Sequence, residues 1–554
     1  MASGSSLTAL LKTSNLVTTL ATALIFVLGF LWLLKHLNRN IKVPAGLRLP
    51  PSPPGARFFG GHSHLWNGRP LSTPSKNQLL QWSKELGEIY HIRLGKRNWF
   101  VLSSREAVRE VFDKNGTNSG SKEALIVAND VLSGGNRLIF MPYGKQWRER
   151  RAIVHQCLSV TAVAKLKPSQ DLESRRYLYD VLVDSDNFMR NVQRYASSVI
   201  LYALYGRQIL TLDDPLMQEI FRSTARFAKV LGTRFLVDEY PILSQLPESL
   251  QWWRWKVDPW RKEGDAMMLR LWNELRSQFE KGIRTGCFVE TFLESGYEKK
   301  GITELQAAWV AGSMIEAGSD TTQLTLNSII LGLLLYPDVV KKAHEELDRV
   351  VGQRMPDLAD AGNLPYVRAI VKEALRWRSP TNDYTRHETT KDIIYKDYFI
   401  PAGSSAILNV WALHWDPEQY LDPEIFAPDR FLNKPSLEMT AGECINTSDV
   451  HNRDHYSFGA GRRVCPGYNL AENSLFLLTA RLLWAFDVQR YTDPRTGVEH
   501  KYDAWAYPAR RLYGPLPFPA TFNVRDVVKE GQIRAGISAE EKRVADNTAS
   551  GKRM

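Results

Sequence analysis

S-F-G-A-G-R-R-V-C-P-G, Ser457 to Gly467, sets a cysteine in a glycine-rich turn ahead of a long apolar helix pattern, YNLAENSLFLLTARLLWAF. A cysteine that ligates iron does so as a thiolate, whose negative charge needs backbone N–H groups in a dry site. We expect Gly461 and Gly467 to let the backbone approach the sulfur of Cys465 where a Cβ would clash. The helix that follows would turn its positive end towards the same sulfur.

A glycine-rich turn with a buried cysteine is the structural alternative, but such a turn has no need of Phe458 and Arg463 together with both glycines. The pattern F-x-x-G-x-R-x-C-x-G resembles the cysteine-ligand motif of the cytochrome P450 superfamily, the haem-thiolate monooxygenases. The resemblance implies that haem b (iron protoporphyrin IX) is the cofactor and that Cys465 is its axial ligand. It also implies that Arg463 contacts a haem propionate and that Phe458 lies against the cofactor.

A second motif lies inside a long predicted helix, from Thr303 to Leu335, which begins with a capping box and stops before a proline. Its centre reads A-G-S-D-T-T. Gly312 and Gly318 each cost about 1 kcal/mol relative to alanine in a helix interior. A kinked core helix with a polar stripe would explain the pattern, but a sequence that accepts such losses in mid-helix usually has a use for them.

This stretch resembles the A-G-x-D-T-T of the oxygen-binding helix in the same superfamily. The resemblance implies that Gly318 leaves room for dioxygen above the iron and that Thr321 donates a hydrogen bond to the oxygen being activated. Asp320 would relay protons to it, which is general acid catalysis.

Two further motifs follow in the order that the superfamily has them. Glu373 and Arg376 in KEALRWR lie at i and i+3 on one helix face, and FAPDRF with Arg430 comes after them. By themselves such pairs are mostly surface ion pairs of little worth. The resemblance implies a buried structural triad behind the haem, which serves the fold rather than catalysis.

Cations for the haem propionates are expected at three more positions. Trp147 and Arg151 match the W-x-x-x-R helix of the superfamily, and Arg386 matches another propionate-binding arginine. A cationic cluster would pair with the two carboxylates of protoporphyrin, which would otherwise be buried without partners. The alternative for any one of these arginines is an ordinary surface charge.

The N-terminus predicts a membrane anchor. Leu16 to Leu34, LVTTLATALIFVLGFLWLL, is an uncharged run of about 19 residues, long enough to cross a bilayer core as a helix. A cleaved signal peptide is the alternative, but no clear cleavage site follows the run. The basic residues after it keep the rest of the chain cytosolic by the positive-inside rule. We expect a single-pass protein of the endoplasmic reticulum membrane.

The expected fold is mainly α, a triangular helical body with small β-sheets at one side, preceded by one transmembrane helix. The expected division is a lumenal segment at 1–15, the anchor at 16–34 and a basic, proline-rich linker at 35–55. The catalytic domain follows at 56–522, and a polar tail at 523–554. No Ser/Gly-rich linker divides the large domain.

Composition limits the partners. The 554 residues carry a formal net charge of +11, but the basic residues are dispersed and no nucleic-acid module is recognisable. The resemblance implies that the motifs in or beside which Lys145, Arg148, Arg150 and Arg462 lie surround the proximal face of the haem, the face with the Cys465 turn, so we expect an acidic partner there. The resemblance implies an NADPH-dependent cytochrome reductase, with cytochrome b5 as an optional second donor. The sequons at Asn115 and Asn446 would face cytosol and stay unmodified.

The sequence defines the residues that bind the substrate less closely than those that bind the haem. The resemblance places the pocket between 115–142, 221–250 and 379–384, and the polar residues of the last segment suit phenol or carbonyl groups. Tyr240 to Trp255 is Trp-rich and would dip into the bilayer or pack as core. The finer similarity is to fungal enzymes that oxidise aromatic polyketides by hydroxylation, epoxidation or coupling. A haem-thiolate isomerase or dehydratase and a non-catalytic haem protein are the alternatives, and the Asp320–Thr321 pair argues against both.

Overall fold

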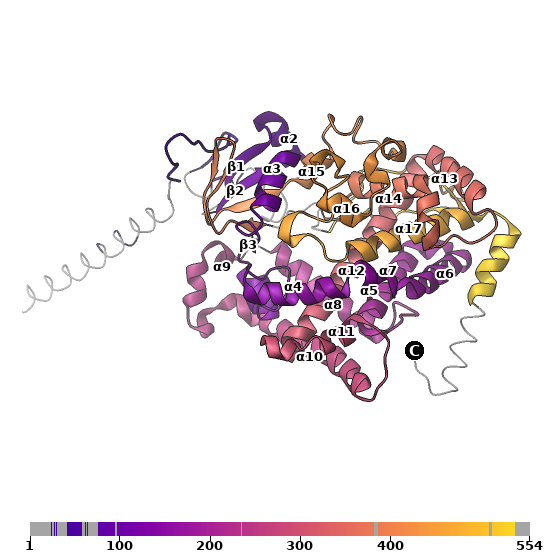
Figure 1. The fold of residues 1–554 in the computed structure, drawn as a ribbon, viewed down its shortest axis with the longest axis horizontal. Helices are drawn as coiled ribbons and strands as arrows, with labels where there is room; N and C mark the ends of the chain where they lie inside the picture. The colour runs from indigo at the N-terminus through magenta and orange to yellow at the C-terminus, as the bar shows by residue number, and fades with distance from the viewer. Residues whose placement is uncertain are drawn as a thin grey trace, which may run out of the picture.

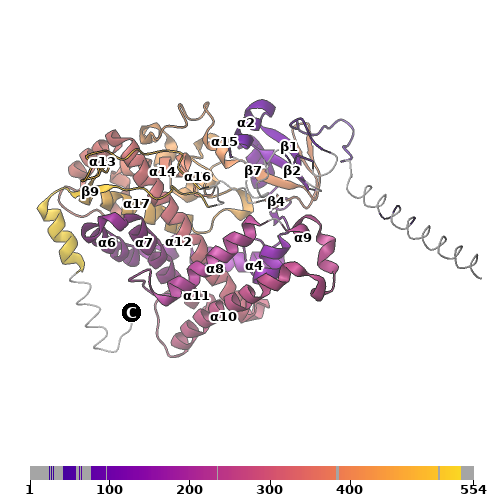
Figure 2. The same ribbon diagram turned by 180° about the vertical axis from the view of Figure 1, so that it is seen from behind.

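The computed structural model describes residues 41–57, 61, 62, 64, 76–94, 97–233, 235–381, 386–508 and 512–537, together with 24, 27 and 29. A large helical body forms most of the molecule, and the largest sheet lies at one side of it (Figures 1 and 2). The predicted class, mainly α with small sheets, is confirmed for these residues. The expected span at 16–34 lies outside the described residues apart from Leu24, Val27 and Gly29.

The helices begin and end as follows. They are α2 (Lys76–Leu86), α3 (Arg105–Val108), α4 (Lys145–Cys157), α5 (Val160–Ala164), α6 (Lys167–Val183), α7 (Phe188–Tyr205), α8 (Pro215–Gly232), α9 (Leu236–Glu239), α10 (Trp252–Glu280), α11 (Phe288–Glu294), α12 (Glu304–Leu335), α13 (Pro337–Val350), α14 (Pro365–Trp377), α15 (Val410–His414), α16 (Ala441–Asn446) and α17 (Tyr468–Ala485). Short turns of helix that matter for the site are η2 (Arg109–Lys114), η3 (Ile126–Val131) and η12 (Gly461–Arg463).

The helix α12 passes through the middle of the body and packs against α7, α10 and α17 (Figure 1). Its predicted capping box is present, because the Thr303 hydroxyl accepts from the Gln306 N–H and the Gln306 side chain accepts from the Thr303 N–H. Pro337 starts α13 directly after it. Most of its length is buried, so its stability comes from packing on all sides rather than from one apolar stripe.

Within the described residues the strands form one five-stranded sheet and two separate two-stranded sheets. The first has the order β1 (Ile89–Leu94), β2 (Arg97–Leu102), β7 (Ser405–Leu408), β4 (His387–Glu388) and β3 (Ser121–Lys122). The pairs are β5 (Ile393–Tyr395) with β6 (Tyr398–Ile400), and β8 (Phe486–Gln489) with β9 (Thr521–Val524). Because β3 pairs with β4 antiparallel, residues around 122 and 387 are brought together from distant parts of the chain.

The linker predicted at 35–55 is docked on the body from residue 41 onward. Ile41 and Leu49 pack against the core cluster under β5 and β6, and the His91 N–H donates to the Pro51 carbonyl at 2.8 Å. Arg48 pairs with Asp397 at the surface. The proline-rich run is therefore extended, as expected, but it is a packed part of the enzyme rather than a free spacer.

The predicted domain end at 522 is too early. It falls inside β9, and residues 527–537 form a helix that follows. Ile533 and Ile537 on this helix are buried, and Arg525 pairs with Asp348 on α13 at 2.6 Å. The two buried isoleucines were hidden in a stretch whose composition is polar, so composition alone gave no signal for them.

Among the described residues, no single helix combines the length and the apolarity that a membrane crossing requires. The bent pair α12 and α13, with 104° between the two helices, meets the criterion by length and composition only.

Candidate active site

The cysteine turn is held in a defined shape before α17. The Cys465 N–H donates to the Phe458 carbonyl at 2.8 Å, and η12 lies between the two residues. The Gly467 N–H donates to the sulfur from the start of α17. Burial raises the pKa of the Cys465 thiol, while this N–H and the nearby Arg151 act against the rise. The arrangement is the one that a thiolate ligand needs: backbone donors, a helix N-terminus and a cation.

Gly461 is required by the backbone, but not for the expected reason. Its φ is +63°, and a Cβ there would lie 2.2 Å from the Phe112 carbonyl oxygen, so the close approach is to η2 and not to the sulfur. The Gly461 N–H donates to Asp113 at 2.9 Å, which ties the turn to that helix. At Gly467 a Cβ would be 3.9 Å from the Cys465 sulfur, an ordinary contact, so the expected clash is absent there.

The W-x-x-x-R helix, α4, lies directly against the cysteine turn. The Arg463 guanidinium carbon lies 4.1 Å from the centre of the Trp147 ring, and Arg151 donates to the Val464 carbonyl. Arg463 itself donates to three carbonyls, those of Gly120, Leu138 and Met141. Burial lowers the pKa of Arg463 to about 9, and the neighbouring Arg151 adds to this. Trp147, Arg151, Arg463 and Cys465 are thus brought together as expected.

Lys122 belongs to the same cluster, although no sequence motif contains it. It is 5% exposed on β3, and burial together with Arg463 holds the pKa of its amine well below the usual range. Its partner across the strands is His387, whose pKa is likewise lowered by burial and by Lys122. Only the pairing register of β3 with β4 shows that Lys122 belongs to the buried cluster. In the sequence the dipeptide Ser121-Lys122 lies in a loop-like stretch without a strand pattern.

Arg386 has another partner. It pairs with Glu123 at 3.0 Å, and this buried carboxylate also accepts from Ser405 at 2.6 Å and pairs with Arg97. Arg386 lies one residue before β4 and therefore close in the chain to the partner strand of Lys122. Its expected contact with a propionate stays a prediction, and its charge is already offset by an acid.

On α12 the polar residues lie in one turn. The Thr321 hydroxyl donates to the Ala317 carbonyl at 2.8 Å, and Asp320 is half-buried beside it. Burial, with a contribution from Glu316, raises the pKa of Asp320 to about 6. Ala317 is exposed in the middle of this central helix, while its neighbours at 315 and 316 are buried. A side chain that solvent reaches inside the helical body indicates an internal space beside this turn.

Gly318 faces away from that space. A Cβ at Gly318 would lie 2.7 Å from the side chain of Ile200 on α7. The missing side chain therefore lets two central helices approach each other, and the room beside the helix is at Ala317. The structure gives Gly318 a role in close helix packing, and its expected role in leaving room for dioxygen stays a prediction. Gly312 is similar, because its Cβ would overlap the side chain of Met268 on α10.

The residues fit a haem with two propionates. Among the described residues Lys122, Arg151 and Arg463 have no acidic partner, although burying three cations together is costly without counter-charges. A dianionic porphyrin edge would supply them. The half-buried sulfur of Cys465 lies in the same cluster, within reach of the Arg151 charge. A macrocycle that places its iron at the sulfur and its carboxylates at these cations fits this chemistry.

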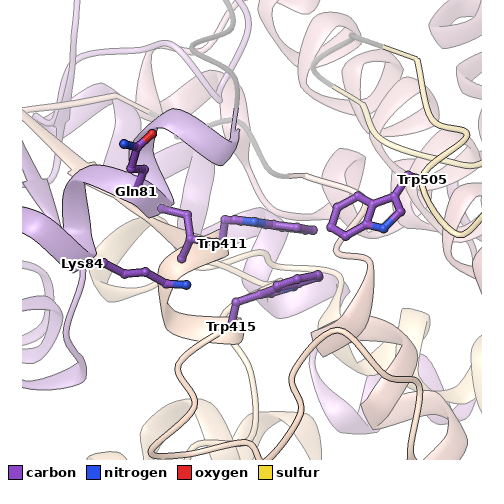
Figure 3. A pocket seen from close by; sticks show the side chains of 6 residues that line it. Gln81, Lys84, Trp411, Trp415 and Trp505 are labelled. Atoms are coloured by element: carbon purple, nitrogen blue, oxygen red, sulfur yellow. The ribbon is translucent and has the colours of Figure 1, made fainter.

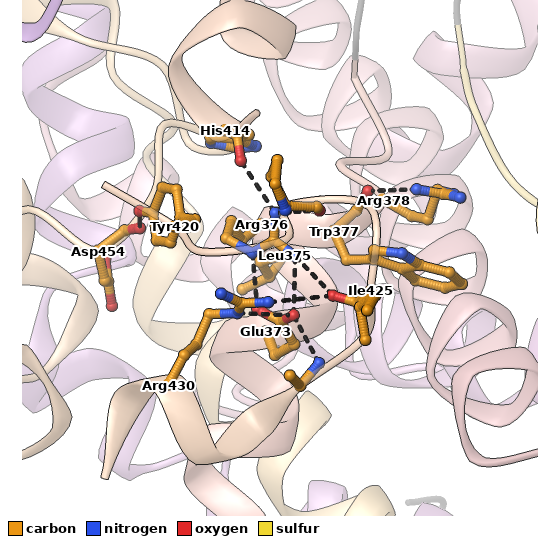
Figure 4. A network of polar contacts seen from close by, with 12 residues as sticks. Glu373, Leu375, Arg376, Trp377, Arg378, His414, Tyr420, Ile425, Arg430 and Asp454 are labelled. Carbon is orange, nitrogen blue, oxygen red and sulfur yellow. Dashed lines mark hydrogen bonds and ion pairs between the residues drawn. The ribbon is translucent and has the colours of Figure 1, made fainter. Parts of the chain in front are cut away.

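The predicted E-x-x-R residues form one buried network (Figure 4). Arg376 binds both oxygens of Glu373 at 2.7 Å, and Arg430 reaches the same carboxylate at 3.1 Å. Arg376 also donates to the carbonyls of His414, Pro423 and Ile425. Glu373 and Arg376 are fully buried. The network clamps the irregular segment 414–430 onto α14 and so supports the chain that leads to the cysteine turn.

A small surface pocket of about 250 Å³ lies elsewhere (Figure 3). Trp411, Trp415 and Trp505 form it together with three residues of α2. The Arg378 guanidinium carbon lies 4.7 Å from the Trp505 ring centre, so the ring stabilises a buried cation. A guanidinium N–H of Arg378 donates to the Ala504 carbonyl. No candidate site residue lines this pocket, and it is separate from the cysteine cluster.

Comparison with known proteins agrees with this geometry. The family model described as cytochrome P450 matches residues 50–507. The cytochrome P450 monooxygenase verL of Clonostachys rogersoniana is 38% identical over 483 residues, 86% of this chain and 87% of that protein. The cytochrome P450 monooxygenase pgmC of Aspergillus terreus is 37% identical over 451 residues, 80% of this chain and 81% of that one. The relative virE of Hypocrea virens is 34% identical and covers 92% of this chain and 90% of its own.

A solved zebrafish cytochrome P450 with progesterone has the same fold, with a TM-score of 0.65, 23% sequence identity, and coverage of 82% of this chain and all of that one. The family match covers most of the described body, from the proline-rich run at residue 50 to residue 507, beyond β8. The cysteine turn, the cation cluster and the clamped segment that supports them are parts of that fold. This chain accordingly belongs to the cytochrome P450 family and is a haem-thiolate monooxygenase.

Proposed function

We propose that the enzyme oxidises a lipophilic small molecule, a fungal secondary metabolite such as an aromatic polyketide, with Cys465 as the axial haem ligand. The observation that carries the site is the convergence of Trp147, Arg151 and Arg463 on the cysteine turn. The fungal relatives, which are cytochrome P450 monooxygenases, support the monooxygenase part of this proposal. Hydroxylation, epoxidation and oxidative coupling are all compatible with this site.

Bound haem supplies the redox and oxygen-activating chemistry, and α12 supplies protons. The Thr321 hydroxyl, now bonded to the Ala317 carbonyl, can turn its hydrogen bond towards the space at Ala317. Asp320, with its pKa raised to about 6, can hold a proton near neutral pH and give it up again. This pair favours oxygen activation over the alternative, a haem-thiolate isomerase or dehydratase that needs no proton delivery to oxygen and no reductase.

The polar pocket segment is described only in part. Thr381 donates to the Ser457 carbonyl at 3.5 Å, so it lies beside the start of the cysteine turn. Residues 382–384, which were expected to bind phenol or carbonyl groups, lie outside the described residues. Their role in recognising the substrate stays a prediction.

Membrane attachment is supported by exposed apolar side chains. Leu24 and Val27, within the proposed anchor, are 58% and 52% exposed. Trp252 and Trp255, at the start of α10, are 48% and 68% exposed. Exposed tryptophans favour a membrane interface. We propose a single anchor at 16–34 in the endoplasmic reticulum membrane, with the body on the cytosolic side and its Trp-rich edge touching the bilayer.

Electrons would come from NADPH through a separate reductase, with cytochrome b5 as a second donor. Lys145, Arg148 and Arg462 are exposed on α4 and on the cysteine turn. Arg150, expected on the same surface, is instead 2% exposed and donates to the Met141 sulfur. Its position on the inner face of α4 follows from the helical period, since Trp147 and Arg150 are three residues apart.

The ligand is tested by the carbon-monoxide difference spectrum. Cys465→Ala should abolish the strongly red-shifted Soret band of the ferrous complex, because that band requires thiolate ligation. Cys157→Ala, Cys287→Ala and Cys444→Ala should keep it, since these thiols are buried in other places. A red-shifted band in Cys465→Ala would overturn the ligand assignment.

The monooxygenase cycle is tested by its electron balance. With reductase present, Thr321→Ala should bind haem normally but release a larger share of NADPH electrons as hydrogen peroxide. Product formation without NADPH and reductase, or equal peroxide release by Thr321→Ala and wild type, would favour the isomerase alternative.

A further inference from the structure

One buried ion pair lies close to the turn of α12 with Asp320 and Thr321, which we call the proton-delivering turn. Neither residue of the pair belongs to a recognised motif. Arg137, from the segment that follows η3, binds both carboxylate oxygens of Glu316, one of them at 3.2 Å. Both side chains are almost completely buried, 3% and 7% exposed. Glu316 also accepts from Ser223 of α8 at 3.4 Å. Removing one partner of such a pair leaves an uncompensated buried charge, so the pair is strongly held.

Arg137 also joins aromatic side chains of two helices. Its guanidinium carbon lies 3.9 Å from the ring centre of Phe227 on α8 and 5.0 Å from that of Trp309 on α12. The Trp309 N–H in turn donates to Asp265 of α10 at 2.6 Å. One arginine therefore links the loop segment, α8 and α12, and reaches α10 through Trp309.

Residues 126–132, shortly before Arg137, belong to a hydrophobic cluster that is separate from the main core, whereas Leu138, directly after Arg137, packs against the main core. We call the separate cluster the lid cluster; its buried members are Ile126, Val127, Ala128, Val131, Leu132, Val230, Val237, Trp253 and Val257. These residues come from η3, α8, α9 and the start of α10. Those of η3, α8 and α9 lie in the ranges 115–142 and 221–250, which were expected to shape the substrate pocket. A cluster outside the main core can move as a unit without unfolding the rest.

Glu316 lies one turn before Asp320 on the same face of α12. Its carboxylate acts on Asp320 and, with burial, raises the pKa of that group. The other charged groups around this turn are Arg137 from the loop and Asp265 of α10, which pairs with Arg261. The helices α7 and α8 contribute Ile200 and Ser223, which carry no charge.

We propose that the Arg137–Glu316 ion pair ties the lid cluster to the proton-delivering turn of α12. The net charge beside Asp320 then depends on whether the lid cluster is packed against α12. With the lid seated, Arg137 offsets the Glu316 carboxylate. When the lid lifts to admit a substrate, Arg137 leaves and the negative charge beside Asp320 is no longer offset. Asp320 then keeps its proton more tightly. Both residues are positioning residues, and the inference rests on Asp320 being the proton donor of the proposed function.

Two substitutions separate this coupling from simple loss of stability. Glu316→Gln removes the carboxylate and should lower the pKa of Asp320, whereas Arg137→Met leaves the carboxylate unpaired and should raise it. In the reductase-supported enzyme without substrate, the fraction of NADPH electrons released as hydrogen peroxide is measured against pH. Its midpoint should move by about half to one pH unit, downward in Glu316→Gln and upward in Arg137→Met. A purely structural role would move both in the same direction or neither.

The tie to the lid is tested without turnover. Hydrogen exchange of the backbone amides at 126–140 in the substrate-free holoenzyme should be faster in both variants, by about tenfold, and Arg137→Lys should restore most of the protection. Glu219→Gln, which breaks the exposed Arg270–Glu219 pair between the same two helices α8 and α10, is the matched control and should leave exchange at 126–140 unchanged.

Unchanged exchange in both variants would overturn the tie, and midpoints that move together would overturn the coupling. A failure of the proposed function has a different pattern. If Asp320→Asn keeps the wild-type peroxide profile, Asp320 is not the donor and the coupling to it falls as well, while faster exchange at 126–140 would still identify the ion pair as the link between lid and helix.

Discussion

The guanidinium group of Arg463 stacks on the ring of Trp147, with 4.1 Å between the guanidinium carbon and the ring centre. The contact joins the cysteine turn to α4, two motifs that are far apart in the chain. It also orients Arg463 beside Lys122, whose amine is buried without an acidic partner among the described residues. The cluster is therefore electrostatically unfavourable until an anion joins it.

Lys122→Met should weaken haem binding while leaving the haem-free protein at least as stable. The substitution would remove the contact to a propionate for which Lys122 is placed, worth about tenfold in affinity, and it removes the cost of burying an amine that has no acidic partner among the described residues. Transfer of haem to apomyoglobin and the melting temperature of the haem-free protein measure the two effects. Arg386→Met should release haem less readily than Lys122→Met, because Glu123 already neutralises Arg386. The reverse order would show that Arg386 is the main propionate ligand.

Glu373→Gln should prevent accumulation of folded, haem-loaded enzyme. It breaks the bidentate contact to Arg376 and leaves a fully buried guanidinium without a counter-charge, which costs about 3–5 kcal/mol. Haem content per protein after purification is the measurement. Glu280→Gln, which removes the exposed pair with Arg276, is the control and should change stability by less than about 0.5 kcal/mol. A haem-loaded Glu373→Gln enzyme would mean that the clamp on 414–430 is dispensable.

The sequence predicted those features that are local or motif-bound. The capping box at Thr303 and the E-x-x-R network have fixed spacings, and each has the expected local geometry. The cysteine turn precedes α17 as expected, but its glycines meet other neighbours than the sulfur. What the sequence could not give depends on contacts across the chain. The direction of Gly318 is set by Ile200 on another helix, and the burial of Lys122 by the pairing of β3 with β4.

The ends of the body were misplaced for a similar reason. Residues 41–55 and 523–537 have the composition of a linker and a tail, yet a few apolar side chains dock them onto the core. Two or three buried residues in a polar stretch leave composition almost unchanged. The pair Arg137–Glu316 was missed as well, because neither residue lies in a recognised motif and only the fold brings them together.

The raised pKa of Asp320 predicts how stability depends on pH. The folded protein holds this proton up to about pH 6, whereas an unfolded chain releases it near 3.8. Between these values the folded state binds more protons, so the free energy of unfolding falls as pH rises. In Asp320→Asn this fall in the free energy of unfolding is absent. The variant should therefore be more stable than wild type above pH 6, by up to about 3 kcal/mol, and similar to it near pH 4. Melting temperatures of both proteins across this range give the test; a difference that does not change with pH would contradict the raised pKa.

Removing residues 1–34 should shift the protein from the membrane pellet towards the soluble fraction and leave its haem content unchanged. Some attachment should remain through the exposed Trp252 and Trp255, because exposed tryptophans bind membrane interfaces. In the truncated protein, Trp255→Ser should reduce the remaining binding to phosphatidylcholine vesicles. Trp505→Ser, at an exposed tryptophan in the surface pocket, is the matched control and should not. A truncated protein that stays in the pellet and loses haem would show that 1–34 belongs to the fold.

The electron donor should dock on the exposed cations around the cysteine turn. Lys145 and Arg148 are exposed on α4, and Lys145 has only a distant helical neighbour, Glu149, at 3.9 Å. Because opposite potentials speed the encounter of two proteins, Lys145→Glu with Arg148→Glu should slow first-electron transfer from the reductase several-fold. The substrate-free absorption spectrum should not change, since neither side chain belongs to the haem cluster. Stopped-flow reduction under carbon monoxide measures the rate.

Salt gives this prediction a second, independent measurement. Exposed charge pairs are screened beyond about 8–10 Å at physiological ionic strength, so raising salt should slow reduction of the wild type more than of the double variant. Arg495→Glu with Lys501→Glu makes the same change in net charge at another exposed place and should keep the wild-type rate and salt slope. If both double variants are slowed equally, net charge rather than a docking surface governs the encounter. If Lys145→Glu with Arg148→Glu keeps both the rate and the salt slope, the reductase binds another face of the protein. The exposed cations of α4 then face solvent and take no part in docking.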